Sequence, residues 1–350
     1  MYLSSGIGVY LQNLIPRLGQ WIPHAEMALL GDATVLQQLA KAVPDAVKHE
    51  INSKIYSVRE QVDLLMQSRT RPAVWWSPHY NIPLAYRGPL VVTVHDLFHL
   101  ANPGLTPGVI KRAYARLMFN TIRRRAQKVI CVSQFTADEF TRLVGGDERQ
   151  REVIHNGLDE GWFDTITDVR PQAAPYFLFV GNVKPHKNIR GLVSAFANVM
   201  SVLPHDLVIV GQKAGFITGD RQSEELAKTL GQRAKFTGSV ELDVLRQWYR
   251  HADALVFPSF YEGFGFPPLE AMAVRCPVVA SNAASLPEIC GDAALYCDPH
   301  DIRSIEHAML RIAQDQTLRE ALRVKGLVQA KRYRWADSAA KTAAILRSFT

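Results

Sequence analysis

The stretch Glu262-Gly-Phe-Gly-Phe-Pro-Pro-Leu-Glu270 joins two carboxylates, with seven residues between them, through a segment rich in glycine and proline. The apolar run at 254–259 before it has the composition of a buried parallel strand. Pro267 suits the first helical position, where a missing N–H costs nothing, and the run at 269–273 favours a helix. We therefore predict a strand, a loop and a helix start, whose backbone N–H groups and helix dipole bind anions.

The two glutamates stand at opposite ends of this loop. We expect Glu270 in the first helical turn and Glu262 just after the strand, where both carboxylates can accept hydrogen bonds from ligand hydroxyls around a bound phosphate. Sugars and ribose carry such hydroxyls. Either residue alone has a structural explanation, since Glu270 would complement the helix dipole by about 0.3 to 1 kcal/mol and Glu262 would be a solvated loop residue. The two glutamates together with Gly263, Gly265 and Pro267 are a more specific sign of a ligand-binding loop than either glutamate alone.

This motif resembles the E-x7-E signature of the retaining glycosyltransferases of family four. The resemblance implies an α/β protein with the GT-B fold, in which two Rossmann-like domains have parallel sheets that face each other across a cleft. It also implies that Glu270 holds the ribose hydroxyls and that Glu262 holds hydroxyls of the donor sugar. In such enzymes the loop backbone meets the sugar and the phosphate, which here involves Gly263, Phe264, Gly265 and Phe266.

The composition is that of a soluble globular protein. The chain has 350 residues, of which 47% are hydrophobic and 21% charged, enough for two domains of ordinary size. No apolar stretch approaches the roughly 18 residues of a membrane span, and the N-terminus lacks the pattern of a signal peptide. The four cysteines have no CxxC spacing, which favours buried free thiols in a cytoplasmic protein.

Short apolar runs alternate with amphipathic stretches, which is typical of doubly wound α/β domains. The strands expected in the first half lie at 73–77, 90–95 and 128–133, and those of the second half lie at 176–181, 206–211, 235–238, 254–257 and 277–281. The polar segment 165–175 reads as the linker. We predict an acceptor-side Rossmann-like domain over 1–168, joined by a C-terminal helix at 335–350, and a nucleotide-sugar-binding Rossmann-like domain over 174–334. Only Met1-Tyr-Leu3 precedes the first glycines, so the first strand of the first domain is missing and we expect the true start upstream.

Two segments are expected to meet the donor diphosphate. Gly6 and Gly8 form a glycine loop that opens a helix, and the resemblance places such a loop opposite the diphosphate. Lys184 and Lys187 follow the first strand of the second domain, where open α/β sheets bind ligands, and each can give a charge-assisted bond of roughly 1.5 to 3 kcal/mol. The family usually carries an arginine where Asn182 stands, so Lys184 is the candidate to replace it. Solvated loop lysines are the alternative.

Two further positions carry the resemblance. His95, followed by Asp96 at the end of a predicted strand, is similar to the family's His-Asp pair, in which the histidine reaches the transferred sugar. A packing role is the alternative for a lone histidine. Val240 ends the segment Phe236-Thr-Gly-Ser-Val240, which looks like the loop whose backbone meets the nucleotide base.

The segment at 110–128 is strongly basic. No acidic residue occurs between Asp96 and Asp138, while seven Lys and Arg residues do, and Ile110, Tyr114, Leu117, Met118 and Ile122 recur at helical spacing. This pattern predicts an amphipathic basic helix or helix pair. It would suit an anionic membrane surface, at about 1 kcal/mol per basic residue, or it is a solvated helix face with a packed apolar stripe.

Together these features predict a retaining hexosyltransferase, specifically a mannosyltransferase of polysaccharide biosynthesis that uses GDP-mannose. The expected acceptor is a saccharide or a polyprenyl-diphosphate-linked saccharide, and the expected location is the cytoplasm, peripheral on the inner membrane. No Asp-x-Asp motif or His/Cys cluster predicts a metal, and no cofactor is expected. The alternatives are a GT-B-type sugar-nucleotide epimerase or phosphorylase, or a nucleic-acid or membrane-binding protein that uses the basic helix. Nucleic acid is not an expected partner, because the segment lacks a recognition motif.

Overall fold

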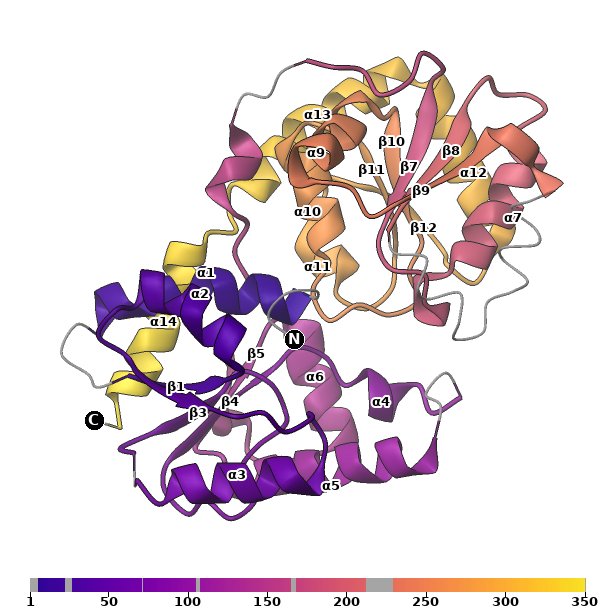
Figure 1. Ribbon diagram of the computed structural model, residues 1–350. Helices are drawn as coiled ribbons and strands as arrows, with labels where there is room; N and C mark the ends of the chain where they lie inside the picture. The colour runs from indigo at the N-terminus through magenta and orange to yellow at the C-terminus, as the bar shows by residue number, and fades with distance from the viewer. Residues whose placement is uncertain are drawn as a thin grey trace. The chain divides into compact units, whose positions relative to one another are not determined.

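The computed structural model describes residues 6–22, 27–70, 72–104, 108–164, 168–211 and 229–349. The chain divides into two compact units, which are described separately (Figure 1). Unit 1 comprises Met1–Gly157 and Arg334–Thr350, and unit 2 comprises Leu158–Tyr333. The boundary between the units after Gly157 therefore lies earlier in the chain than the predicted end of the first domain at residue 168. Arg246 donates to the Asp164 carbonyl at 2.7 Å and the Trp162 ring lies 5.7 Å from that of Tyr249, so this segment packs with unit 2.

Unit 1 contains parallel strands between helices. The strands are β1 Ala28–Gly31, β2 Val47–Glu50, β3 Trp75–Ser77, β4 Leu90–Val94, β5 Lys128–Cys131 and β6 Arg151–Val153. The helices are α1 Gly6–Trp21, α2 Ala33–Ala42, α3 Val58–Ser68, α4 Phe98–Ala101, α5 Val109–Arg125, α6 Gln134–Leu143 and α14 Trp335–Arg347, with a 3-10 turn at Glu148–Gln150.

Strands β3, β4, β5 and β6 form one parallel sheet in that order, and β1 and β2 form a separate parallel pair. Every residue of β4 is buried, as expected for a central strand covered on both faces. Helix α14 returns the end of the chain to this unit, where it packs on α1. At this junction the Ser338 hydroxyl donates to the His155 carbonyl at 2.6 Å, and the Trp335 ring lies 5.9 Å from that of Tyr10.

Unit 2 is a parallel six-stranded sheet between helices. Its strands are β7 Tyr176–Val180, β8 Asp206–Val210, β9 Ala234–Gly238, β10 Ala254–Phe257, β11 Val278–Ser281 and β12 Leu295–Cys297. Its helices are α7 Ile189–Val199, α9 Leu242–His251, α10 Phe266–Ala273, α11 Leu286–Cys290, α12 Ile302–Gln314 and α13 Gln316–Ala330, with 3-10 turns at Glu160–Phe163, Pro185–Lys187 and Gly231–Arg233. Helices α7 and α12 pack together on one side of the sheet, and α10 packs with α9 and α13 on the other (Figure 1).

The strand order of this sheet is β12-β11-β10-β7-β8-β9. The chain therefore runs outward from β7 in one direction and then starts again from β10 in the other. The point between β7 and β10 is a topological switch point, and in open α/β sheets ligands bind there, outside the carboxyl ends of the strands. The strand order alone therefore predicts a ligand-binding site in unit 2 at the carboxyl ends of β7 and β10.

All eight predicted strands are present, with ends that differ by no more than two residues. Strands β1, β2, β6 and β12 were missed. Each has only three or four residues, and β2 and β6 consist largely of charged and polar residues. The segment of the missing first strand lies outside the described residues, as do residues 165–167 of the predicted linker.

The basic segment forms one helix, α5, but its predicted apolar stripe is partly wrong. Ile110 and Leu117 are 85% and 51% exposed, and the buried side chains are Ala115, Met118, Phe119 and Ile122. At 3.6 residues per turn, positions 110 and 117 share one face and the buried residues occupy another. Among the helices of the described ranges, none has both the length and the apolar character needed to cross a membrane.

Candidate active site at the switch point of unit 2

Two oppositely charged side chains meet at the switch point. Lys187 lies in the turn after β7 and Glu262 lies in the loop after β10, the neighbouring strand. The Lys187 ammonium donates to Glu262 Oε1 at 2.5 Å, and the two side chains are 16% and 12% exposed. The Lys187 Nζ atom also lies 5.3 Å from the centre of the Phe257 ring. A cation and a carboxylate of this site, far apart in sequence, are therefore paired with each other.

The turn that carries Lys187 is held in place by Asn188. Its backbone has a left-handed φ of 54°, which asparagine tolerates better than most residues, and its side chain accepts from Gly191 N at the start of α7. The side-chain amide donates to the carbonyls of Pro258 and Pro299 at 3.1 and 2.7 Å. Asn188 is 5% exposed, so these bonds are largely shielded from water. They tie the turn after β7 to the loop after β10.

The loop that carries Glu262 is held by two buried serines. Ser281 donates to the Ser259 carbonyl at 2.6 Å, and the Ser285 hydroxyl lies 3.0 and 2.8 Å from the carbonyls of Glu262 and Phe264. Gly265 has a φ of 109°, and a Cβ there would come within 2.7 Å of Leu286. Only glycine fits this position, so the loop has a defined path into α10.

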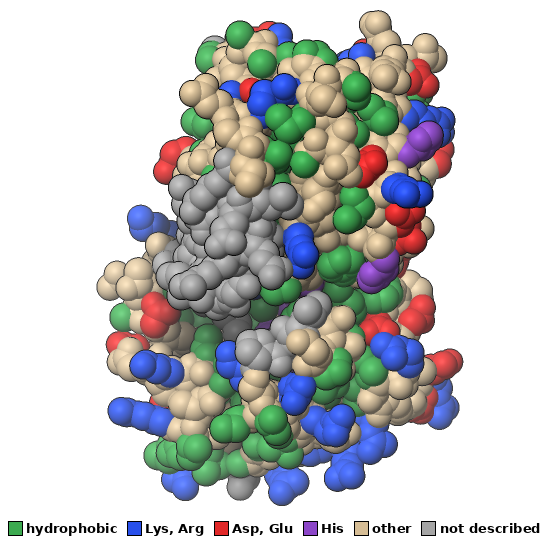
Figure 2. Space-filling view, turned by 90° about the vertical axis from the view of Figure 1, so that its right-hand side faces the viewer, with side chains coloured by type: hydrophobic (Ala, Val, Ile, Leu, Met, Phe, Trp, Pro, Cys, Tyr) green, Lys and Arg blue, Asp and Glu red, His purple; other side chains and the backbone are tan. Residues whose placement is uncertain are grey.

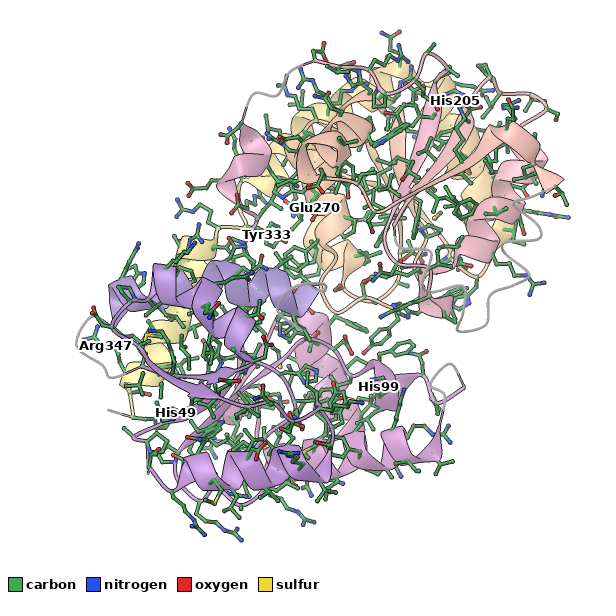
Figure 3. The ribbon with its side chains drawn as sticks, in the orientation of Figure 1. His49, His99, His205, Glu270, Tyr333 and Arg347 are labelled. Atoms are coloured by element: carbon green, nitrogen blue, oxygen red, sulfur yellow. The ribbon has the colours of Figure 1, made fainter. Side chains whose placement is uncertain are left out.

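Glu270 lies on α10 (Figure 3). The prediction that it occupies the first helical turn is wrong, as is the placement of Pro267 at the first position: Gly265 is the N-cap, so Phe266 is first, Pro267 second and Glu270 fifth. Burial raises the pKa of Glu270 to about 7, and the hydrogen bond from the Tyr249 hydroxyl at 2.8 Å opposes that rise. The carboxylate therefore changes its protonation near neutral pH.

The remaining predicted residues of unit 2 follow the same sheet edge. Lys184 is exposed in the turn after β7, and Val240 is half-buried in the connection from β9 to α9. Gly263 and Phe264 lie between Glu262 and α10, and Phe266 is the first residue of that helix. The centre of the Phe264 ring lies 5.2 Å from that of Phe266 and 5.7 Å from that of Tyr333. All of these residues follow carboxyl ends of parallel strands.

In unit 1, His95 directly follows β4. Its Nε2 lies 2.9 Å from the Pro78 carbonyl oxygen, and the centres of the His95 and Tyr10 rings lie 4.8 Å apart, with the rings nearly perpendicular. A carbonyl can only accept, so Nε2 carries the proton, and burial lowers the pKa of the ring. The neutral ring then has Nδ1 as an acceptor. Gly6 and Gly8 are helical residues of the first turn of α1, not loop residues as predicted, because the helix begins at Gly6.

Several residues that shape the site were missed by sequence reasoning. Asn188, Ser281 and Ser285 stood in recognised segments, but nothing in the sequence shows which carbonyls they contact. Tyr249 precedes β10 on an amphipathic helix and is fully buried, so it reads as an ordinary core residue until its hydroxyl is seen at Glu270. In the ranges that the structure describes, no group of three or more His, Cys, Asp or Glu side chains is placed to hold a metal ion.

Two parallel-sheet units, one of which has a cation and two carboxylates around its switch point, are typical of glycosyltransferases. The comparisons agree. Residues 174–315 match the family model described as glycosyl transferases group 1, and residues 48–162 match the one described as glycosyltransferase family 4. The chain belongs to these glycosyltransferases and has the GT-B fold.

Curated relatives cover most of the chain. It is 27% identical to O-antigen chain mannosyltransferase B of Escherichia coli over 97% of this chain and 95% of that protein. It is 28% identical to O-antigen chain mannosyltransferase RfbU of Salmonella typhimurium over 71% and 72%. A solved structure of Anabaena HepE in complex with UDP-glucose is 19% identical and has a TM-score of 0.79 over 99% of this chain and 97% of that one, a likeness that shows the fold.

Proposed function

We propose that this glycosyltransferase moves mannose from GDP-mannose to a saccharide hydroxyl, with retention of configuration, in cell-surface polysaccharide assembly. The observation that carries the proposal is the Lys187–Glu262 pair at the switch point, 2.5 Å apart and largely buried. A nucleoside diphosphate sugar has a dianionic diphosphate next to a sugar ring that carries hydroxyls. Its binding site therefore needs a cation for the diphosphate next to a hydrogen-bond acceptor for the hydroxyls. The names of the relatives favour mannose as the sugar.

Each site residue has a role in this proposal. Lys187, helped by Lys184, neutralises the diphosphate, while Glu262 accepts from hydroxyls of the sugar and Glu270 from those of the ribose. The backbone at 263–266 meets the sugar and phosphate, and the Val240 backbone meets the base. In unit 1, the Nδ1 atom of His95 accepts a hydrogen bond from a hydroxyl of the transferred sugar, and the segment of Gly6 and Gly8 faces the diphosphate.

The reaction exchanges one bond at the anomeric carbon. The bond to the β-phosphate oxygen breaks, the acceptor oxygen bonds to the same face, and the acceptor proton passes to the leaving phosphate oxygen. No separate base is required, which fits a site whose carboxylates bind hydroxyls. Positioning and stabilisation of the departing diphosphate then supply most of the rate enhancement.

A panel of nucleotide sugars tests the donor by thermal shift. A ligand that binds only the folded protein raises its melting temperature in proportion to ln(1 + [L]/Kd). GDP-mannose should give a larger rise than GDP-glucose, UDP-glucose or UDP-galactose at equal concentration. A larger rise with a UDP-sugar would reject GDP-mannose. Analysis of the products by NMR tests the rest: an α-mannoside supports retention, a new nucleotide sugar formed without acceptor indicates an epimerase, and dependence on inorganic phosphate indicates a phosphorylase.

We also propose that the diphosphate is bound without a divalent ion, because Lys187 and Lys184 supply positive charge at the switch point. Transfer should then proceed at the same rate in excess EDTA and in excess Mg²⁺ or Mn²⁺. Loss of activity with EDTA and its recovery with either ion would reject this part of the proposal.

Peripheral association with an anionic membrane is supported by the outer surface of α3 and α5. The Tyr56 ring, directly before α3, lies 5.5 Å from the ring of Tyr114 on α5, and both helices expose apolar and basic side chains. The exposed apolar residues are Val58, Val62, Leu65, Met66, Val109, Ile110 and Leu117. The basic ones are Arg59, Lys111, Arg112, Arg116 and Arg124. Figure 2 shows green and blue side chains gathered at the lower end of that view.

Sedimentation with lipid vesicles tests this surface. The protein should bind vesicles of phosphatidylcholine that contain phosphatidylglycerol, and Lys111→Glu or Ile110→Asp should weaken binding by about fivefold, as expected for about 1 kcal/mol per group. Val202→Asp, at a position 68% exposed on unit 2, is the matched control. Equal binding by all variants, or binding that does not depend on the anionic lipid, would reject the membrane role.

A further inference from the structure

A cluster of aromatic and polar side chains lies near His95 in unit 1. Tyr56 precedes α3, His79, Tyr80 and Asn81 follow β3, and Tyr114 lies on α5. We call Tyr56, His79, Tyr80 and Tyr114 the aromatic cluster. Its rings contact one another: the Tyr56 ring centre is 5.5 Å from that of Tyr114, 6.1 Å from that of Tyr80 and 6.1 Å from that of His79.

Tyr56 has an unusual backbone and an open ring. Its φ of 66° is in the left-handed region, which costs a bulky residue about 1 to 3 kcal/mol. Its side chain nevertheless remains 44% exposed. Burial of the ring does not offset this cost, and the hydrogen bond that Tyr56 N donates to Glu60 stabilises the backbone instead. Strained residues of this kind occur most often where a ligand is held.

A hydrogen-bond network holds the cluster in position. The Glu60 carboxylate accepts from Tyr56 N at 2.6 Å and from the Asn81 amide at 2.7 Å, and the Tyr114 hydroxyl donates to Asn81 Oδ1. Glu60 is 9% exposed, so the network is shielded from water. The backbone of Tyr56 and the hydroxyl of Tyr114 are thus held before any ligand arrives, which lowers the entropy cost of binding.

The cluster is continuous with His95. Strands β3 and β4 are adjacent and parallel, so the residues that follow them share the carboxyl edge of this sheet. The His95 ring bonds to the carbonyl of Pro78, the residue directly before His79. Towards α4, the Tyr80 ring lies 6.4 Å from that of His99, which Figure 3 labels. Burial, with His95 and His99 nearby, lowers the pKa of His79 to about 3, so its ring is neutral.

We infer that the aromatic cluster binds a sugar ring of the acceptor, an assignment that rests on the proposed transfer reaction. A pyranose has one face of C–H groups and a rim of hydroxyls. The exposed Tyr56 ring offers an apolar surface, and the neighbouring phenol and imidazole groups offer neutral donors and acceptors. Binding sites of this kind are mostly apolar with a few oriented polar groups. A phosphate or a nucleotide would instead need a cation, and none belongs to the cluster.

Binding is tested without any transfer, by saturation-transfer NMR with methyl α-mannoside and α-linked mannobiose. The wild type should transfer saturation to the sugar protons, and Tyr56→Gly should reduce the signal at least about fivefold, since burying an aromatic ring is worth a few kcal/mol. The glycine removes the ring and also relieves the positive φ, and a thermal melt confirms folding. Trp21→Ala removes a ring of similar exposure, 46%, from the end of α1 and is the control.

Kinetics then separate this inference from the proposed function. For Tyr56→Gly and His79→Ala, the acceptor KM should rise about tenfold or more while the donor KM stays within about twofold. No NMR signal with the wild type, an unchanged acceptor KM, or equal rises of both KM values would overturn the acceptor site. A wild type that binds the sugar but neither transfers nor hydrolyses any nucleotide sugar would instead overturn the transfer reaction.

Discussion

In unit 2 the loops at the carboxyl edge of the sheet present charge, with Lys187 paired to Glu262 and Glu270 on the following helix. In unit 1 the corresponding loops after β3 and β4 present aromatic groups, including His79 and His95, beside the carboxylate of Asp96. The two sheets share parallel topology, yet their edges suit different ligands. A diphosphate requires a cation, whereas a neutral sugar ring requires apolar contact and oriented hydrogen bonds. The comparison teaches that topology selects the edge and side chains select the ligand.

Removing the cation should have the largest effect. We expect Lys187→Met to lower kcat by about 100-fold or more, because it removes the charge that stabilises the departing diphosphate. Methionine keeps the unbranched stem and loses only the ammonium, which lies 5.3 Å from the centre of the Phe257 ring, so folding should persist. Steady-state kinetics and a thermal melt measure both. Lys331→Ala, at an exposed position of unit 2, is the control. Near-normal turnover of Lys187→Met would show that Lys187 does not stabilise the diphosphate. It would also contradict the proposed difference between the carboxyl edges of the two sheets.

Neutralising Glu262 in its ion pair with Lys187 should change GDP binding and the transfer rate in opposite directions. In Glu262→Gln the competitor for Lys187 is neutral, so GDP should bind about three- to tenfold more tightly, the gain expected when an ion pair no longer has to be broken. Transfer should nevertheless be at least about tenfold slower, because the amide accepts the sugar hydroxyl less well than the carboxylate. Calorimetry with GDP and kinetics with donor measure the two quantities. Weaker GDP binding would show that Glu262 supports the phosphate site and does not compete for its cation.

The pKa of Glu270, about 7, predicts opposite effects of pH on binding and stability. The carboxylate is the better acceptor for ribose, so donor KM should rise as pH falls below about 7. For stability, the folded protein favours the protonated form; this contribution is full below 4.5, the pKa of an exposed glutamate, and is lost as pH rises through 7. Glu270→Gln should therefore be more stable than wild type at pH 8, by on the order of 2 kcal/mol, and equal at pH 4.5. Urea unfolding at both pH values checks this, and no difference at pH 8 would contradict it.

The smallest effect should come from Tyr249, a positioning residue. Tyr249→Phe removes the hydroxyl that bonds to Glu270 and leaves the buried ring in place. Donor KM should rise about three- to tenfold, which corresponds to the net contribution of a typical hydrogen bond, about 0.5 to 1.5 kcal/mol, while kcat changes less. The pH at which donor KM rises should also move upward, since the lost bond had lowered the pKa of Glu270. A rise in KM without that movement would indicate a packing defect only.

Much of unit 2 could be predicted from the sequence. Long apolar strands such as β7 and β8 are buried at every position, so composition alone marks them. The loop from Glu262 to α10 could be predicted because glycine and proline are required at particular backbone positions. The short strands of unit 1 could not, since Val47–Glu50 is mostly exposed and carries two charges and a histidine. The aromatic cluster could not be predicted for another reason. Its members lie on three separate segments, and no local sequence pattern joins Tyr56 to Tyr114.

By itself, the sequence predicted the class of the protein, because the glycines and prolines between Glu262 and Glu270 meet backbone requirements that are local along the chain. It also determined that Lys187 follows a strand of the second unit. Only the tertiary structure decided that Lys187 pairs with Glu262, that Tyr249 supports Glu270 and that Glu60 holds Tyr56. These contacts depend on which strands become neighbours. Strand order is set by the burial of whole faces, which no short stretch of sequence records.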